Sequence, residues 1–285
     1  MIDQQSLFVE RLSEHDLRVL AGLSGAPGTV PALREQLADR PESIEPYLAH
    51  PDLYHVLFAD QDPGMIPGLS PLLAFSSLVY QARRDLGSAS YVPEWVGAGE
   101  RLPVFDVESL RLFIDDTTRR YLIIELLNSF TRVASGTMWV RTPRGYRRRR
   151  FSELDPVHLA EMVESLPTAQ RAGGYRRLGD VALFLTGVFP DHTARHPVSA
   201  LGRARLARSI GVSNDEGFGA EYLRFLEQLG SAWYGRAANT PFLPTSFRES
   251  LEEMATGFTP ARRFLNYVAD RYLHRLDTGL MNPVS

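Results

Sequence analysis

The chain has 285 residues and a formal net charge of −3, from 31 basic and 34 acidic side chains. It contains no cysteine and no lysine, so its cations other than histidine are all arginine. Disulfides, thiolate metal sites, cysteine nucleophiles, a P-loop lysine and lysine Schiff bases are therefore excluded. The near balance of charge disfavours binding of polyanions over the whole surface, so any such contact must be local.

The N-terminal segment gives no sign of export. It begins Met1-Ile-Asp-Gln and lacks a basic stretch followed by an apolar one, so no signal peptide is predicted. The most apolar windows, 68–80 and 178–190, are shorter than the roughly 20 residues that a membrane-spanning helix needs. We therefore expect no membrane span and a cytoplasmic location.

The first part of the chain favours short helices. A helix is predicted over 6–23, with Ser13 as the cap of its second part. Closely spaced prolines between Pro27 and Pro71 then limit helix length, and three further helices are predicted near them, over 31–39, 42–50 and 51–59. We interpret 1–62 as a small helical N-terminal region packed on the rest of the chain, and 63–285 as the main helical domain.

The next segment contains the longest helical pattern. A helix over 70–86 is predicted to begin with Ser70 as its cap. The span 88–103, rich in proline, glycine and aromatic residues, is predicted to be an irregular loop pinned to the core by its aromatic side chains. A helix over 106–134 follows. Its second half is apolar nearly all round, which indicates a central buried helix.

Residues 137–151 predict a β-hairpin whose second strand is strongly basic. The sequence Thr142-Pro-Arg-Gly145 fits a turn with proline second and glycine fourth. Six of the ten residues 141–150 are arginine and none is acidic. Because strand residues alternate between faces, Tyr146, Arg148 and Arg150 would share one face, and Arg147, Arg149 and Phe151 the other. Arginines on both faces are atypical of a half-buried strand.

A basic ribbon of this kind can hold phosphate or carboxylate groups through its planar guanidinium groups. We predict a binding site for an acidic protein or a nucleic acid, formed by Arg141, Arg144, Tyr146, Arg147, Arg148, Arg149 and Arg150. Tyr146 and Trp139 can also stack on bases. The alternative is a solvated hairpin whose arginines pair with nearby acids, namely Glu153, Asp155, Glu161 and Glu164.

The remaining sequence is again helical. Helices are predicted over 156–165, 175–189, 198–210, 213–230, 246–256 and 260–276, with breaks at Pro167, Gly173-Gly174 and 235–244. The segment 181–188 is apolar on all sides, which indicates a second central helix. The predicted fold class is all-α, a multi-helix bundle around the helices near 106–134 and 175–189, with one inserted β-hairpin at about 137–151.

Two acidic groups support a different interpretation. Asp115-Asp116 on one helix, and Asn214-Asp215 with Glu221 on another, resemble the magnesium–diphosphate sites of class I terpene cyclases, which are all-α. The resemblance covers these two short motifs only, and Arg119 and Phe218 depart from the family pattern. It implies an all-α enzyme that depends on a metal and a diphosphate. For such an enzyme we expect an interior pocket lined by Trp95 and Trp233, each from an irregular loop. The alternative is an ion ladder, because Arg111, Asp115 and Arg119 are four residues apart.

Other catalytic patterns are weak. His192 and His196 have the spacing of helical metal ligands, but Pro190 and Pro197 bracket them, so we predict a polar loop. The chain has neither a Gly-x-Ser-x-Gly motif nor a glycine-rich dinucleotide loop after a strand. We therefore expect no metal and no cofactor, and the sequence favours a non-catalytic binding or scaffold protein over an enzyme.

Overall fold

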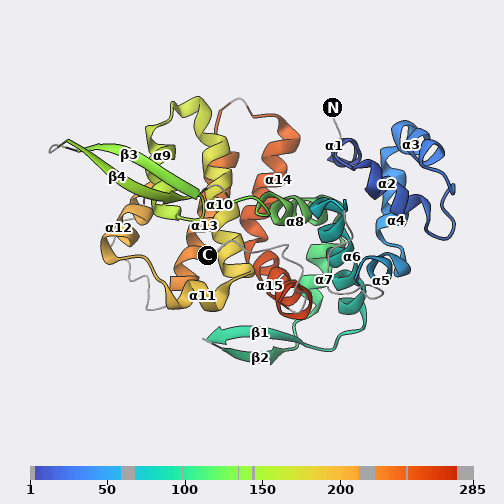
Figure 1. Ribbon diagram of the computed structural model, residues 1–285. Helices are drawn as coiled ribbons and strands as arrows, with labels where there is room; N and C mark the ends of the chain where they lie inside the picture. The colour runs from blue at the N-terminus through green and yellow to red at the C-terminus, as the bar shows by residue number, and fades with distance from the viewer. Residues whose placement is uncertain are drawn as a thin grey trace. The chain divides into compact units, whose positions relative to one another are not determined.

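The computed structural model describes residues 4–58, 68–97, 99–133, 135–142, 145–211, 222–241 and 243–274, with backbone alone for 135–142 and 146–151 (Figure 1). The chain divides into two compact units. Unit 1 contains 1–91, 106–131 and 270–285, and unit 2 contains 92–105 and 132–269. Most of the described residues are helical, which confirms the all-α class with an inserted hairpin. The region 1–62 lies within unit 1, and the division of the chain into this region and a main domain over 63–285 stays a prediction.

Unit 1 is built around a buried helix, α6. Its helices are α1 (Gln4–Glu10), α2 (Glu14–Ala21), α3 (Val30–Asp39), the 3-10 turn η1 (Pro41–Ile44), α4 (Glu45–Leu48), α5 (Pro51–Phe58), α6 (Pro71–Ser88), α7 (Glu108–Asp115) and α8 (Thr117–Ser129). Leu73, Phe75 and Leu78 on α6 are fully buried, and α6 packs against α5, α7 and α8. Ser70 caps α6, as predicted, by accepting from the Leu73 N–H at 3.2 Å.

The predicted helix over 6–23 is two helices, because a buried aspartate organises the break between them. Ser13 and Asp16 form a capping box at the start of α2. One Asp16 oxygen accepts from the Ser13 N–H at 2.8 Å, and the other accepts from the Ser70 N–H at 2.9 Å. Asp16 therefore joins the beginnings of α2 and α6.

The predicted helix over 106–134 is also divided, at Asp116. This residue has an extended ψ of 125°, and its carboxylate accepts from the Arg119 N–H at 2.9 Å, which makes it the N-cap of α8. Arg120 donates to the carbonyls of Ile114 and Asp115 at 2.8 and 2.9 Å. The side chains of Asp116 and Arg120 thus replace helical hydrogen bonds that the break removes.

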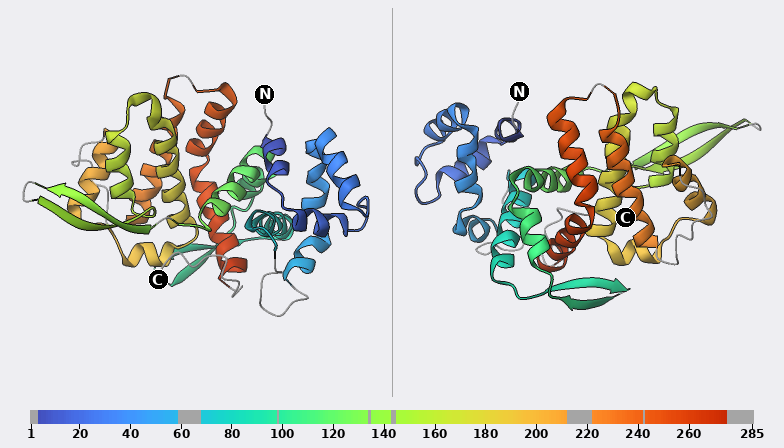
Figure 2. Two further views of the ribbon diagram at one scale, coloured as in Figure 1. Left: turned by 45° about the horizontal axis from the view of Figure 1, so that its top comes forward. Right: turned by 180° about the vertical axis from the view of Figure 1, so that it is seen from behind.

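Unit 2 contains two hairpins and a second buried helix, α10 (Figure 2). Its elements are β1 (Val92–Gly97), β2 (Glu100–Val104), β3 (Ser135–Thr142), β4 (Gly145–Ser152), α9 (Pro156–Ser165), the 3-10 turn η2 (Thr168–Gln170), α10 (Arg171–Gly187), α11 (Pro190–Arg195), α12 (Ala200–Ser209), α13 (Tyr222–Ala238), α14 (Thr245–Thr256) and α15 (Phe258–Val268). A π-helical turn, η3 (Ala269–Leu273), follows. Helix α10 packs against α9, α13 and α15. The two predicted central helices are therefore core helices of different units.

Two glycines inside helices permit close packing, although one of them, Gly174, was predicted to break a helix. Gly174 lies inside α10, where a Cβ atom would stand 2.4 Å from Cγ2 of Val163 on α9. Gly230 on α13 is similarly close to the ring of Phe258 on α15, at 2.3 Å. The predicted turn over 235–244 begins later than expected, because α13 continues to Ala238.

The span 88–103, predicted to be a loop, mostly forms the antiparallel hairpin β1–β2. Its register pairs Val92 with Val104 and Trp95 with Arg101, and a bulge follows Trp95. Pro93 pairs with Pro103, which a ribbon of two strands tolerates because each strand has an unpaired edge. Among the described residues, no helix is both long enough and apolar enough to cross a membrane.

Candidate functional site

The predicted arginine-rich hairpin is present as β3–β4. The two strands pair only with each other within the described sheets, and the register opposes Arg150 to Thr137 and Arg147 to Val140. The ribbon extends beyond the helices of unit 2 in each view (Figures 1 and 2). Gly145 begins β4 with a φ of 113°, a backbone conformation that favours glycine.

The structure places the backbone of most predicted binding residues on this ribbon. Arg141 lies on β3, and Tyr146 and Arg147 to Arg150 lie on β4. The side chains of these residues, and the whole of Arg144, lie outside the described residues. Their role in binding stays a prediction.

The acids that follow the hairpin have partners in the helices of unit 2. Glu153 forms an ion pair with Arg177 at 2.8 Å, and Glu161 pairs with Arg205. Asp155 caps α9, accepting from the N–H groups of Val157 and His158 at 3.0 and 3.2 Å. In the alternative interpretation, these acids neutralise the hairpin arginines. The same acids would then also have to keep the contacts that stabilise α9 and α10.

The paired aspartates have structural roles in unit 1. Asp115 forms an ion pair with Arg83 at 2.6 Å, and Asp116 caps α8. Asn214, Asp215 and Glu221, the second half of the resemblance, lie outside the described residues. Within the described part of the chain, no group of three or more histidine and acidic side chains could hold a metal ion.

The two tryptophans predicted to line a pocket are each hydrogen-bonded within unit 2. Trp233 is fully buried on α13, and its indole N–H donates to the Ser209 hydroxyl at 3.0 Å. Trp95 lies on β1, and its indole N–H donates to Asp191 at 2.8 Å. The predicted loop positions are wrong for both residues, because one lies on a helix and the other on a strand.

The predicted polar loop at His192 is wrong, since the segment forms the short helix α11. Pro190 occupies the first turn of this helix, a position where the missing proline N–H costs no helical bond. The rings of His192 and His196 stack with their centroids 4.4 Å apart, and Nδ1 of His196 lies 2.9 Å from the His192 carbonyl oxygen.

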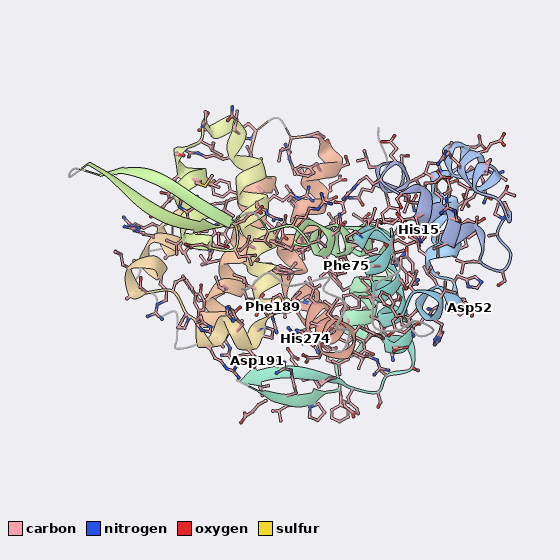
Figure 3. The ribbon with its side chains drawn as sticks, in the orientation of Figure 1. His15, Asp52, Phe75, Phe189, Asp191 and His274 are labelled. Atoms are coloured by element: carbon pink, nitrogen blue, oxygen red, sulfur yellow. The ribbon has the colours of Figure 1, made fainter. Side chains whose placement is uncertain are left out.

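Asp191 at the start of α11 anchors the hairpin β1–β2 through hydrogen bonds. It was not among the residues predicted from the sequence. One carboxylate oxygen accepts from the Gly99 N–H at 2.7 Å and from the Trp95 indole, and the other accepts from Arg101 at 3.1 Å. Figure 3 places Asp191 beside the hairpin turn. Burial raises the pKa of this carboxyl group, but the hydrogen bonds from Gly99, Trp95 and Arg101 outweigh it and hold the pKa below its usual value.

A second set of ion pairs connects β1 to α15 and α13. The Glu94 carboxylate pairs with Arg262 and Arg263, both at 3.0 Å, and Arg262 also pairs with Glu227 at 3.1 Å. Asn266, which accepts from Arg262 at 3.0 Å, donates to the Gly187 carbonyl at 2.6 Å. The network therefore continues from the hairpin to the C-terminal end of α10.

Comparison of the chain with protein-family models, curated proteins and solved structures finds no match. The function is therefore inferred from the two ribbons of unit 2. The side chains of β1–β2 form ion pairs and hydrogen bonds with α11 and α15. Strand β4 contains four consecutive arginines and no acid.

Proposed function

We propose that this is a non-catalytic binding or scaffold protein whose hairpin β3–β4 docks an anionic partner, either an acidic protein or a nucleic acid. The observation that carries the proposal is a ribbon that extends beyond the helices of unit 2 and has four consecutive arginines, Arg147 to Arg150, on one strand. Guanidinium groups bind phosphate and carboxylate groups through paired hydrogen bonds, and they stay charged across the physiological pH range.

The charge of the rest of the chain supports a contact confined to the ribbon. The chain has a net charge of −3, and the six arginines of the segment 141–150 contribute +6 of it. The rest of the chain therefore carries a net charge of −9. A polyanion is repelled by the remainder and attracted only by the ribbon. The partner should therefore present a narrow anionic surface, and its binding should weaken as salt is added.

Replacement of Arg147 to Arg150 by serine tests the proposal. The control variant removes the same charge from exposed arginines elsewhere, at Arg18, Arg34, Arg40 and Arg248. Binding is measured by fluorescence anisotropy with two labelled probes, a short RNA duplex and poly-L-glutamate, at low and at physiological salt.

We expect at least one probe to bind the wild type and the control variant in a salt-dependent manner. The hairpin variant should lose this binding, and the probe that binds identifies the class of partner. Failure of both probes to bind the wild type, or equal binding by the hairpin variant, would contradict the proposal.

We further propose a cytoplasmic location, where nucleic acids and acidic proteins are both accessible. Subcellular fractionation of the tagged full-length chain tests this location. Recovery in the membrane fraction or in the medium would contradict it.

A further inference from the structure

Unit 1 contains a cavity of about 360 Å³ with a positive lining. Its walls are formed by Ala49, Tyr80, Arg83, Arg84, Gly87, Arg111, Ile114 and Asp115. The volume lies within the range of small-ligand sites. Three arginines and one aspartate give this lining a formal charge of +2.

Arg111 forms a fixed part of the wall. It donates to the carbonyls of Leu86 and Ala89 at 2.9 and 2.8 Å, at the C-terminal end of α6. These carbonyls carry the negative end of the helix dipole, so the guanidinium offsets a charge that would otherwise repel an anion.

Arg84 carries a partly buried charge without an acidic partner among the described residues. Its hydrogen bonds go to neutral acceptors, namely the Ala49 carbonyl at 2.9 Å, the Gln81 amide oxygen at 2.6 Å and the Pro51 carbonyl at 3.5 Å. Burial lowers its pKa, against the weaker effects of Asp85, Tyr272 and Asp52. A bound anion would supply the missing counter-charge.

The neighbouring Arg120 shows what such a counter-charge does. Its side chain is 3% exposed, pairs with Glu45 at 3.2 Å and lies over the Tyr80 ring. Burial alone would lower its pKa, but Tyr80 and Glu45 outweigh that effect and raise it. Unit 1 thus contains a buried arginine, Arg120, that has an acidic partner. It also contains a partly buried arginine, Arg84, that lies beside the cavity and has no acidic partner among the described residues.

Arg83 offers donors to the cavity. Its Nε atom pairs with Asp115 at 2.6 Å, and its two terminal amino groups have no other partner in the described part of the chain. Asp115 is therefore both the only acid in the lining and a competitor for Arg83.

We propose that this cavity binds a small ligand through its phosphate group, which Arg83 and Arg84 hold in front of Arg111. A phosphate monoester carries a charge of about −1.5 to −2 at neutral pH, which matches the charge of the lining. The site lies in unit 1, so it is separate from the ribbon that docks a macromolecule and independent of that proposal.

Inorganic diphosphate is the probe, and its affinity for the full-length protein is measured by isothermal titration calorimetry at constant ionic strength. The variant Arg83→Gln removes the available donors, and Asp115→Asn removes the competing acid. The control is Arg40→Gln, which changes an exposed arginine that pairs with Asp39 in the same unit.

We expect Arg83→Gln to weaken binding about tenfold or more, as the loss of a charge-assisted contact should. Asp115→Asn should strengthen binding several-fold, and Arg40→Gln should leave it unchanged. The opposite signs separate ligand binding from general damage, which would weaken binding in both cavity variants. Absence of saturable binding by the wild type, or weaker binding by Asp115→Asn, would overturn the proposal.

Citrate tests the chemical class of the ligand under the same conditions. We expect it to bind more weakly than diphosphate. Binding of citrate that is tighter than that of diphosphate would overturn the assignment to phosphate.

Discussion

The two hairpins of unit 2 differ in the charges that their strands carry. In β1–β2, Glu94 and Arg101 each pair with charged residues that arrive from distant helices, and Asp191 binds the turn. Strand β4 concentrates four arginines where the chain provides no acid in either strand. The ribbon β1–β2 is thus fixed by the opposite charges that the fold brings to it. An excess of one sign points toward a partner outside the chain.

The largest effect should follow from Arg262→Ala, which breaks the network under β1. It leaves Glu94 and Glu227, both mostly buried, without their shared cation. Loss of one partner of a buried pair costs about 3–5 kcal/mol, and we expect the lower value because the site is partly hydrated. Urea denaturation measures the change in the free energy of unfolding.

The matched control is Arg40→Ala, which removes an exposed ion pair with Asp39. Its effect should be below about 0.5 kcal/mol. Equal effects of the two variants would show that the network under β1 contributes nothing special to stability.

A smaller effect is expected from Asp191→Ala, which frees the turn of β1–β2 from α11. The variant loses hydrogen bonds from Gly99, Trp95 and Arg101, and we expect a loss of about 2 kcal/mol in the free energy of unfolding. The variant Asp191→Asn should recover part of this loss, because the amide oxygen of asparagine can still accept hydrogen bonds. No difference between Ala and the wild type would contradict the anchoring role.

The contribution of Asp191 should also depend on pH. Because its pKa is lower in the folded protein, its stabilisation is present above the unfolded value of about 3.9 and is lost as pH falls through the folded value. The stability difference between the wild type and Asp191→Ala should therefore be constant near neutral pH and shrink in acid. A difference that grew in acid would show that folding raises the pKa of Asp191.

A pair of glycine substitutions compares the two ribbons directly. Gly99 and Gly145 both have positive φ, 77° and 113°. Gly99→Ala should cost about 1 kcal/mol of global stability, because its turn is fastened to α11. Gly145→Ala should cost less, since its ribbon extends beyond the helices of unit 2 and can relax locally. A larger effect at Gly145, measured by thermal unfolding, would contradict this contrast.

The sequence predicted well what local patterns determine. Ser13 and Ser70 were placed correctly as caps, and the hairpin at 137–151 formed within two residues of its predicted ends. It failed where a distant partner decides the structure. Nothing near Asp16 indicated that its carboxylate would accept from the distant Ser70 N–H, and nothing near Gly174 showed that Val163 would pack against it.

The functional residues divide in the same way. The arginine run is visible because its chemistry is local. The acceptor Asp191 and the cavity around Arg84 depend on residues about 90 and 35 positions away in the chain, at Gly99 and Ala49, and only the fold brings them together.

Docking through β3–β4 is tested most directly by the salt dependence of binding by the wild type and by the variant with serine at Arg147 to Arg150. For the RNA duplex, each lost phosphate contact should reduce the slope of log Kobs against log salt by up to about 0.9. We predict a slope shallower by about 2–4, with a melting temperature within about 2 °C of the wild type. With poly-L-glutamate the slope should fall in the same direction. An unchanged slope and affinity for the probe that the wild type binds would contradict the proposed role of the four arginines.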